Sequence, residues 1–231
     1  MALFEAKEVG ASYSHAGEGG GLLSAVSFAL EEGRVYDLIG PSGSGKSTLL
    51  RVCALMMERT GGTLLLQGKE SGQFAPTAWR RQVCLVPQIP TLIPSTVRAN
   101  LVLPWRLKVR AGEAPPDDEA LLGLLERGGL AGIGLDRDAS QLSGGQAARV
   151  ALLRAFAAKP CVMLLDEVDA ALDDESAHAI GRLTHSLVGT GITCLRVRHR
   201  KADGFASGVF RLKEGTLSYS DPDSDSAAGR P

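Results

Sequence analysis

The stretch "GPSGSGKST", residues 40–48, decides the fold of this chain. It matches the pattern G-x-x-x-x-G-K-[ST] and lies between the strand-like run "RVYDLIG" and the apolar helical run "KSTLLRVCALMM". The glycines let backbone N–H groups turn toward phosphate oxygens, and the helix N-terminus adds the positive end of its dipole. We therefore predict an α/β protein whose phosphate-binding loop consists of Gly40, Pro41, Ser42, Gly43, Ser44, Gly45, Lys46, Ser47 and Thr48.

Two side chains of this loop have separate predicted roles. Lys46 is expected to reach the β- and γ-phosphates of a nucleoside triphosphate, and the Ser47 hydroxyl is expected to coordinate Mg²⁺. Charge-assisted hydrogen bonds of this kind contribute roughly 1.5–3 kcal/mol each, so several together can hold a triphosphate at low micromolar concentration. The alternative is a chance glycine- and serine-rich loop before a helix, which the flanking strand and helix disfavour.

A second apolar run, "CVMLLDE" at residues 161–167, ends in two acids. A parallel strand that is buried on both faces is continuously apolar, and α/β folds place ligand chemistry at its carboxyl end. Asp166 is expected to bind Mg²⁺, directly or through water. Glu167 is expected to take a proton from an attacking water. A strand followed by an ordinary acidic turn is the alternative, and the nearby phosphate loop makes it less favourable.

The stretch "LSGGQ", residues 142–146, indicates a second anion-binding helix start. Taken alone, a serine that only caps a helix is the simpler interpretation. Because residues 40–48 already hold one set of phosphates, a second cradle without a lysine suggests that it serves the ATP of another subunit. The residues concerned are Ser143, Gly144, Gly145 and Gln146.

Together these motifs resemble the nucleotide-binding subunit of an ABC transporter, over about residues 2–217. The phosphate loop, Gln88 at the end of "VCLVPQ", "LSGGQ", "VMLLDE" and "AALD" occur in the family's order and at family-like spacing. The resemblance implies an ABC ATPase fold in a single domain, residues 1–217. That fold combines a P-loop core with a parallel sheet, an N-terminal antiparallel β subdomain and an inserted helical subdomain. The expected core is 1–88 and 141–217, the helical lobe is about 89–140, and 218–231 is expected to be a disordered tail.

The resemblance also implies roles for individual residues. Two such subunits face each other head to tail, and each ATP lies between one phosphate loop and the partner's "LSGGQ" segment, where Ser143 and Gly145 contact the γ-phosphate. Gln88 is expected to sense Mg²⁺ and the lytic water, and His199 to hold the γ-phosphate. Tyr13 is expected to stack on adenine, although it could simply be a strand aromatic. The catalytic set is intact, which implies an active ATPase.

The stretch "VDAALD", residues 168–173, departs from the family's usual "PTSALD". Ala170 replaces a serine and Asp169 adds an acid, which puts one hydrogen bond between subunits in doubt. Asp173 remains and is retained as an expected contact of the nucleotide site.

Several charges stand where apolar residues are more usual. The run "LRVRHR", residues 195–200, carries three arginines next to His199, which could pair with Asp169, with Asp173 or with phosphate. Asp37 lies in the strand before the phosphate loop and has no obvious partner in the sequence. The arginines are Arg196, Arg198 and Arg200.

Composition limits the remaining classes of function. The 231 residues carry a net charge of −1 and no long run of Lys or Arg, so no nucleic-acid partner is expected. No apolar run is long enough to cross a bilayer, and the four cysteines are expected to be buried, reduced thiols. Any link to a membrane is therefore expected to come through a partner, and the resemblance to ABC transporter subunits implies a peripheral protein at the cytoplasmic face of the cell membrane, bound to a transmembrane permease. His178 and His185 could share a helix face, where a solvated surface is a better interpretation than a metal pair.

The segment "QIPTLIPSTVRANLVLPW", residues 88–105, is apolar but broken by prolines. It resembles the corresponding segment of the small FetA-type iron-export ATPases, which implies metal export. ATPases of phosphate, amino-acid or lipoprotein transporters are the alternative. We expect the segment to be a hinge and docking surface for the permease, with Ile93, Leu101 and Trp105 as contacts, or else part of the core of the lobe. A non-transport ABC protein is disfavoured by the single cassette, and a P-loop kinase or GTPase by "LSGGQ".

Overall fold

The computed structural model describes residues 2–12, 21–89, 91–170, 172–188, 191–200 and 202–222. Tyr13, which we expected to stack on adenine, lies outside the described residues. Of the expected disordered tail, residues 223–231 also lie outside them.

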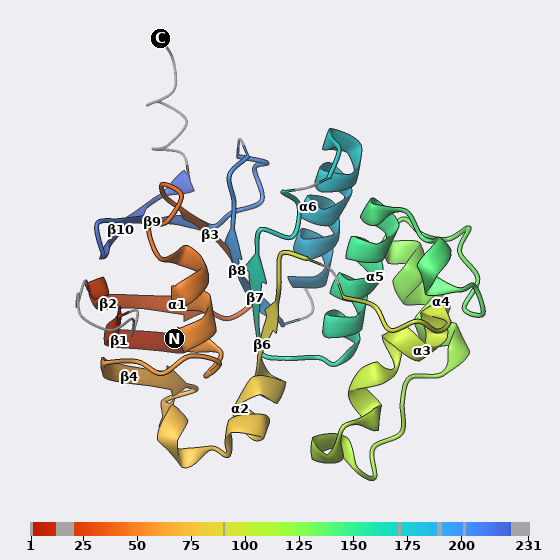
Figure 1. Ribbon diagram of the computed structural model, residues 1–231, viewed down its shortest axis with the longest axis horizontal. Coiled ribbons are helices and arrows are strands. Elements are labelled where there is room, and N and C mark those ends of the chain that lie inside the picture. Colours follow the sequence, from red (N-terminus) through yellow and green to blue (C-terminus); the bar gives the residue numbers. More distant parts are fainter. Residues whose placement is uncertain are drawn as a thin grey trace.

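Two β-sheets form the left and centre of the molecule in Figure 1. The first is antiparallel and has the order β2-β1-β4-β5; its strands are β1 (Ala2–Ser12), β2 (Gly21–Glu31), β4 (Gly61–Leu66) and β5 (Lys69–Glu70). The second has the order β10-β9-β3-β8-β7-β6 and is parallel except for its edge strand β10. Its strands are β3 (Val35–Ile39), β6 (Val83–Val86), β7 (Val162–Asp166), β8 (Thr193–Val197), β9 (Gly208–Lys213) and β10 (Thr216–Ser220).

Helices cover both faces of the second sheet. The helices of the described residues are α1 (Lys46–Cys53), α2 (Pro76–Gln82), α3 (Val97–Leu101), α4 (Asp118–Arg127), α5 (Gly144–Ala157) and α6 (Asp174–Val188), with short 3₁₀ turns at Ser71–Gln73, Leu103–Arg106, Lys108–Arg110 and Ala139–Gln141. The segment between β6 and α5 carries α3 and α4 and lies at the far side of α5 (Figure 1). The predicted α/β fold with an antiparallel subdomain is confirmed. In the part of the chain that the structure describes, no helix has the length and apolar character needed to span a membrane.

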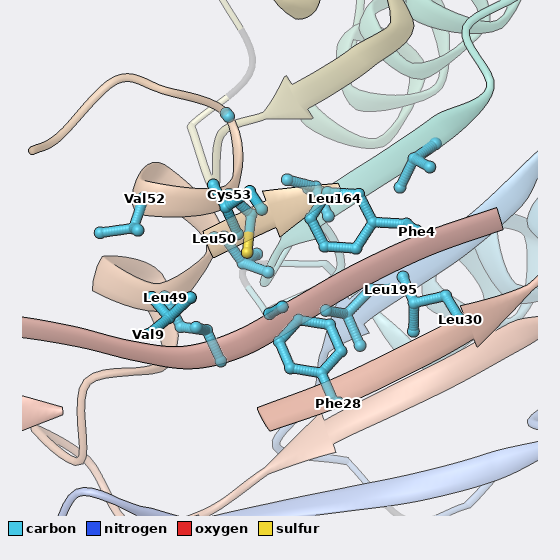
Figure 2. Packing of buried hydrophobic residues seen from close by; sticks show 14 of the residues in the cluster. Phe4, Val9, Phe28, Leu30, Leu49, Leu50, Val52, Cys53, Leu164 and Leu195 are labelled. Carbon is cyan, nitrogen blue, oxygen red and sulfur yellow. The ribbon is translucent and has the colours of Figure 1, made fainter. Parts of the chain in front are cut away.

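The core consists of two apolar clusters, one on each face of the parallel sheet. Figure 2 shows the first, in which α1 is packed between the two sheets: Leu49 and Leu50 of α1 belong to the same cluster as Phe4 of β1 and Leu164 and Leu195 of the parallel sheet. The second joins the other face to α5, α6 and the α3–α4 segment. Strands buried on both faces are usually apolar, and the run "VMLL" with Asp166 at its end forms the fully buried strand β7.

Three predicted boundaries are wrong. The run "RRQVCLVPQ", residues 80–88, predicts a strand, but residues 80–82 belong to α2, because Pro76 occupies the favoured first helical position and Trp79 is fully buried below the helix. Helix α1 ends at Cys53, before the predicted end at residue 57. The expected tail does not begin at 218, because β10 continues to Ser220 and pairs with β9, where the Tyr219 ring lies 5.3 Å from that of Phe210.

Candidate functional site

The loop at residues 40–48 connects β3 to α1, and its backbone requires glycine. A Cβ added to Gly40 would lie 2.1 Å from the carbonyl oxygen of Leu212 on the neighbouring strand β9. Gly43 and Gly45 have φ of 77° and 100°, in the left-handed region that other residues rarely adopt. The loop therefore turns back tightly over the end of the sheet and presents backbone N–H groups at the start of α1.

Lys46 lies at the first position of α1, with its side chain folded over the loop. Its ammonium donates hydrogen bonds to the carbonyl oxygens of Gly40 (2.9 Å) and Pro41 (2.8 Å). Burial lowers the pKa of Lys46, and the nearby carboxylates of Glu167 and Asp166 oppose that shift. The Ser44 hydroxyl oxygen is buried and has no hydrogen-bond partner among the described residues. A buried cation beside a buried polar atom that can still accept or donate a bond fits a phosphate ligand.

Ser47 and Asp166 meet although they are far apart in the sequence. The Ser47 hydroxyl donates to Asp166 Oδ1 at 2.7 Å, because α1 begins and β7 ends at the same edge of the sheet. Hydroxyl and carboxylate oxygens are hard donors of the kind that Mg²⁺ prefers. The donor set therefore fits a magnesium ion at this edge.

Glu167 follows β7 and contacts two other predicted site residues. Its Oε2 accepts a hydrogen bond from Gln88 Nε2 at 3.2 Å, and its Oε1 lies 2.8 Å from His199 Nε2. Glu167 also has φ of 51°, which is uncommon for a residue with a side chain and costs energy. Such a conformation directs the carboxylate away from the line of β7, so that Glu167 and Asp166 face different partners.

The "LSGGQ" segment begins α5 with a reciprocal pair of hydrogen bonds. Ser143 Oγ accepts from the Gln146 backbone N–H at 3.3 Å, and Gln146 Oε1 accepts from the Ser143 N–H at 3.0 Å. Helix α5 lies on the opposite face of the parallel sheet from α1 (Figure 1). The second predicted phosphate cradle therefore belongs to a different surface of the subunit from the loop at residues 40–48.

Comparisons with known proteins agree with this geometry. The family model described as ABC transporter matches residues 23–170. The chain belongs to the ABC transporter family. The iron export ATP-binding protein FetA of Escherichia coli K12, a protein described as probable in that role, is 38% identical over 181 residues, covering 78% of this chain and 79% of FetA. The methionine import ATP-binding protein MetN of the same strain is 37% identical over 184 residues, covering 77% of this chain and 52% of MetN.

A solved structure extends the similarity to the fold. The ATP-binding cassette MJ0796, in a dimeric post-hydrolysis state bound to ADP and Pi, superposes with a TM-score of 0.82 at 27% identity, covering 95% of this chain and 98% of that one. This chain is thus an ATP-hydrolysing subunit of an ABC transporter.

The structure supplies partners for the unusual charges of this ABC subunit. Asp37 Oδ1 accepts from Arg196 Nε at 2.5 Å, so the acid without an obvious partner is one half of a buried ion pair. Burial acts to lower the pKa of Arg196, but the carboxylates of Asp37 and Asp203 outweigh it and raise that pKa. Arg198 pairs with Asp203 as well, and its Nε lies 3.8 Å from Asp169 Oδ2.

Arg200 pairs with the same loop, but not with Asp173. It donates to Asp174 Oδ1 at 2.5 Å and to the carbonyl oxygen of Leu172. Asp173 instead accepts from the backbone N–H (2.8 Å) and the hydroxyl (3.0 Å) of Ser176, and these bonds lower the pKa of Asp173. A Cβ on Gly145 would lie 2.5 Å from that hydroxyl, so Asp173 and the "LSGGQ" segment are linked through Ser176.

The segment 88–105 is only partly a surface. Leu101 is fully buried in the second core cluster, so its prediction as a docking contact is wrong: the turn of α3 directs it inward. Ile93 and Trp105 are half-buried, whereas Ile89 is 76% exposed. Sequence reasoning missed Asn100, which is fully buried and whose amide binds the backbone of Ile93 and Thr96. An asparagine inside an apolar run was the signal for it.

The two histidines of α6 are both exposed. The ring of His185 stacks on Phe205 with centroids 4.8 Å apart. Among the described residues, no group of three or more His, Cys, Asp or Glu side chains could hold a metal ion. The exposure of both residues fits the solvated helix surface that we predict there.

Proposed function

We propose that this subunit hydrolyses ATP by in-line attack of water, with Glu167 as the general base and Lys46 as the main cationic contact of the phosphates. The convergence of Gln88, His199 and Glu167 at the carboxyl end of β7 carries the proposal. Glu167 takes the proton of the water that Gln88 orients, and His199 holds the γ-phosphate on the other side. The loop at residues 40–48 binds the β- and γ-phosphates through its N–H groups and Lys46.

Ser47 and Asp166 hold Mg²⁺ in this proposal, together with Gln88. When bound, Mg²⁺ neutralises charge that develops on the phosphate oxygens. The 2.7 Å contact between the Ser47 hydroxyl and Asp166 supports these two as neighbouring ligands. Tyr13 stacks on the adenine.

Two subunits bind two ATP molecules in a head-to-tail dimer, where Ser143 and Gly145 of one subunit contact the γ-phosphate held by the other. The position of α5 on the far face from α1 supports this, because each subunit then needs a partner to complete its site. The dimeric state of MJ0796 supports it as well. Gln146 and Gly144 complete the cradle, and Asp173 holds the adjoining start of α6 through Ser176.

The dimer drives a separate transmembrane permease from the cytoplasmic face of the cell membrane, and its cargo is a metal ion, with iron export as the preferred case. The identity with FetA over most of both chains supports this cargo. The similarity to MetN supports amino-acid transport as the second candidate. Ile89, Ile93 and Trp105 are among the accessible apolar side chains of the segment next to Gln88, and we propose that they contact the permease.

Two substitutions test the proposed chemistry. Lys46→Ala should abolish tight MgATP binding, measured by calorimetry, because the buried cation that faces the phosphates is lost. Glu167→Gln keeps the shape and the contact to His199 but removes the base, so it should bind ATP, accumulate a closed dimer and lower turnover by about 10²–10⁴-fold. Wild-type affinity in the first variant, or unimpaired hydrolysis in the second, would overturn the corresponding role.

Vesicles test the cargo. The subunit is reconstituted with its cognate permease in proteoliposomes, and ATP-dependent movement of Fe²⁺ and of methionine is measured in parallel. Glu167→Gln serves as the control that binds ATP without turnover. Iron movement that requires an intact Glu167 supports metal export, whereas methionine movement alone would replace it with the second candidate.

A further inference from the structure

Five charged side chains form a buried network on the face of the parallel sheet that α6 covers. Each is only 5–10% exposed, and each has an oppositely charged neighbour in the network. They come from β3, from β8 and its extension, and from the loops that follow β7 and β8. The charge network consists of Asp37, Asp169, Arg196, Arg198 and Asp203.

The ion pairs run in one continuous path. Arg196 binds Asp37 at 2.5 Å and donates two bonds to Asp203, at 2.7 and 2.9 Å. Asp203 also binds Arg198, whose Nε then lies 3.8 Å from Asp169 Oδ2. The path therefore begins in the middle of the sheet and ends at the loop that follows β7.

The far end of the path joins the two segments that carry the proposed catalytic groups. Asp169 lies two residues after Glu167, and Arg198 directly precedes His199. Glu167 Oε1 and His199 Nε2 are themselves 2.8 Å apart. Arg200 adds a second link of the same kind, because it binds Asp174 and the Leu172 carbonyl from the other side of His199. Two arginines that flank His199 thus hold the loop that contains Glu167.

Stability alone does not explain the network. Transferring charges from water into a protein interior costs several kcal/mol per ion, and apolar side chains of similar volume are often at least as stabilising. Helix α6 also carries a destabilising glycine where it packs against the network. A Cβ on Gly181 would lie 2.8 Å from Asp203 Oδ2, and a glycine inside a helix costs about 0.5–1 kcal/mol relative to alanine.

We propose that Arg198 is a positioning residue for ATP hydrolysis: held by Asp203, which Arg196 anchors, it fixes Asp169 and thereby the loop that places Glu167 opposite His199. The inference rests on the proposed roles of Glu167 and His199 and assigns no direct contact of Arg198 with the nucleotide. The main contacts of the ATP phosphates remain with the loop at residues 40–48, on the side of the sheet that faces α1. A loss of Arg198 should therefore affect turnover much more than affinity.

The test compares steady-state kinetics and ATP affinity of the full-length protein. Arg198→Met keeps most of the volume of the side chain and removes the charge; we expect kcat to fall about 10–100-fold while the KM and Kd for ATP stay within about twofold. Arg198→Lys should recover part of the loss, because an ammonium can still reach a carboxylate. Gly181→Ala, which crowds Asp203 without removing a charge, should lower kcat in the same direction. Arg34→Met, at an exposed arginine paired with Glu31, is the matched control and should leave both constants unchanged.

The outcomes separate the inference from the proposed function. Wild-type kcat in a folded Arg198→Met protein would overturn the positioning role, and so would equal losses of kcat and ATP affinity. Should Arg198→Met fail to fold, Gly181→Ala decides in the same way. Because Glu167→Gln tests the base independently, loss of hydrolysis there together with full activity in Arg198→Met sinks only this inference.

Discussion

Strands β3 and β8 present apolar side chains on one face of the sheet and both apolar and charged side chains on the other. Toward α1 they present Tyr36, Leu38, Leu195 and Val197, all buried in the first core cluster. Toward α6 they begin with Val35 and Cys194, which are apolar, and then change to Asp37 and Arg196. Each strand alternates its side chains between the faces, so the difference depends on single positions in the sequence.

The charges begin halfway along the strands and continue toward the edge where Glu167 and His199 meet. Far from that edge, both faces follow the rule that buried parallel strands are apolar. Near it, the α6 face departs from the rule while the α1 face does not. The difference teaches that the α1 face serves stability, whereas the α6 face combines stability with the placement of two loops.

Arg196→Leu should have the largest effect on the α6 face. The variant leaves three buried carboxylates, those of Asp37, Asp203 and Asp169, with Arg198 as the one cation of the network. We expect a loss of about 3–5 kcal/mol in the free energy of unfolding. Urea denaturation measures the loss, and ATP hydrolysis in the folded fraction should fall as well.

A triple variant sharpens that result. Replacing Asp37, Arg196 and Asp203 together by leucine leaves only the pair of Arg198 with Asp169, so stability should return to within about 2 kcal/mol of the wild type. Hydrolysis should remain low, because Arg198 has then lost its ion pair with Asp203. Full recovery of both hydrolysis and stability would mean that the charges on the α6 face have no role in hydrolysis.

Leu195→Ala tests the α1 face at the adjacent position of the same strand. Leu195 is 1% exposed and packs beside Phe4 and Leu164, so we expect a loss of about 2–4 kcal/mol from the lost contacts and the cavity. In contrast to Arg196→Leu, the kcat of the folded protein should be unchanged at 25 °C. A fall of kcat comparable to that of the charge variants would remove the distinction between the faces.

Much of the candidate nucleotide site, at the edge of the sheet where α1 begins and β7 ends, was predictable from the sequence because its motifs are local. The spacing of residues 40–48 places Lys46 and Ser47 at a helix start, and the end of an apolar strand places Asp166 and Glu167 at the same edge. The parallel sheet follows from alternation of strands and helices. The predicted roles of these residues remain to be tested by the substitutions above.

The charge network could not be derived in the same way. Arg196 and Asp37 are 159 positions apart, and their pairing depends on β3 lying next to β8 in the sheet. The sequence shows two unusual charges but not their partners, and no motif marks Asp203, which lies in a loop after β8. Helix α2 and strand β10 were missed for a related reason: short segments with few apolar residues take their structure from what they pack against.

Asn100→Ala should have the smallest of these effects, and it extends the comparison to the α3–α4 segment. The buried amide accepts from the Ile93 N–H at 2.8 Å and donates to the Ile93 and Thr96 carbonyls, both at 3.1 Å. Its loss removes both bonds to the half-buried backbone of Ile93, whereas the Thr96 carbonyl keeps the bond from the backbone N–H of residue 100; we expect a decrease of about 1–3 kcal/mol in the free energy of unfolding.

The Asn100 amide binds the backbone of Ile93, which lies shortly after Gln88 in the sequence. We therefore expect its loss to lower hydrolysis by only about two- to fivefold, less than in the Arg198 variants. Thr96→Ala is the control: it removes the cap of α3, where Thr96 accepts from the Ala99 N–H, without freeing Ile93. It should cost about 1 kcal/mol and leave hydrolysis unchanged. An equal loss of hydrolysis in both variants would mean that helix α3, and not the anchoring of residues 88–93, controls the position of Gln88.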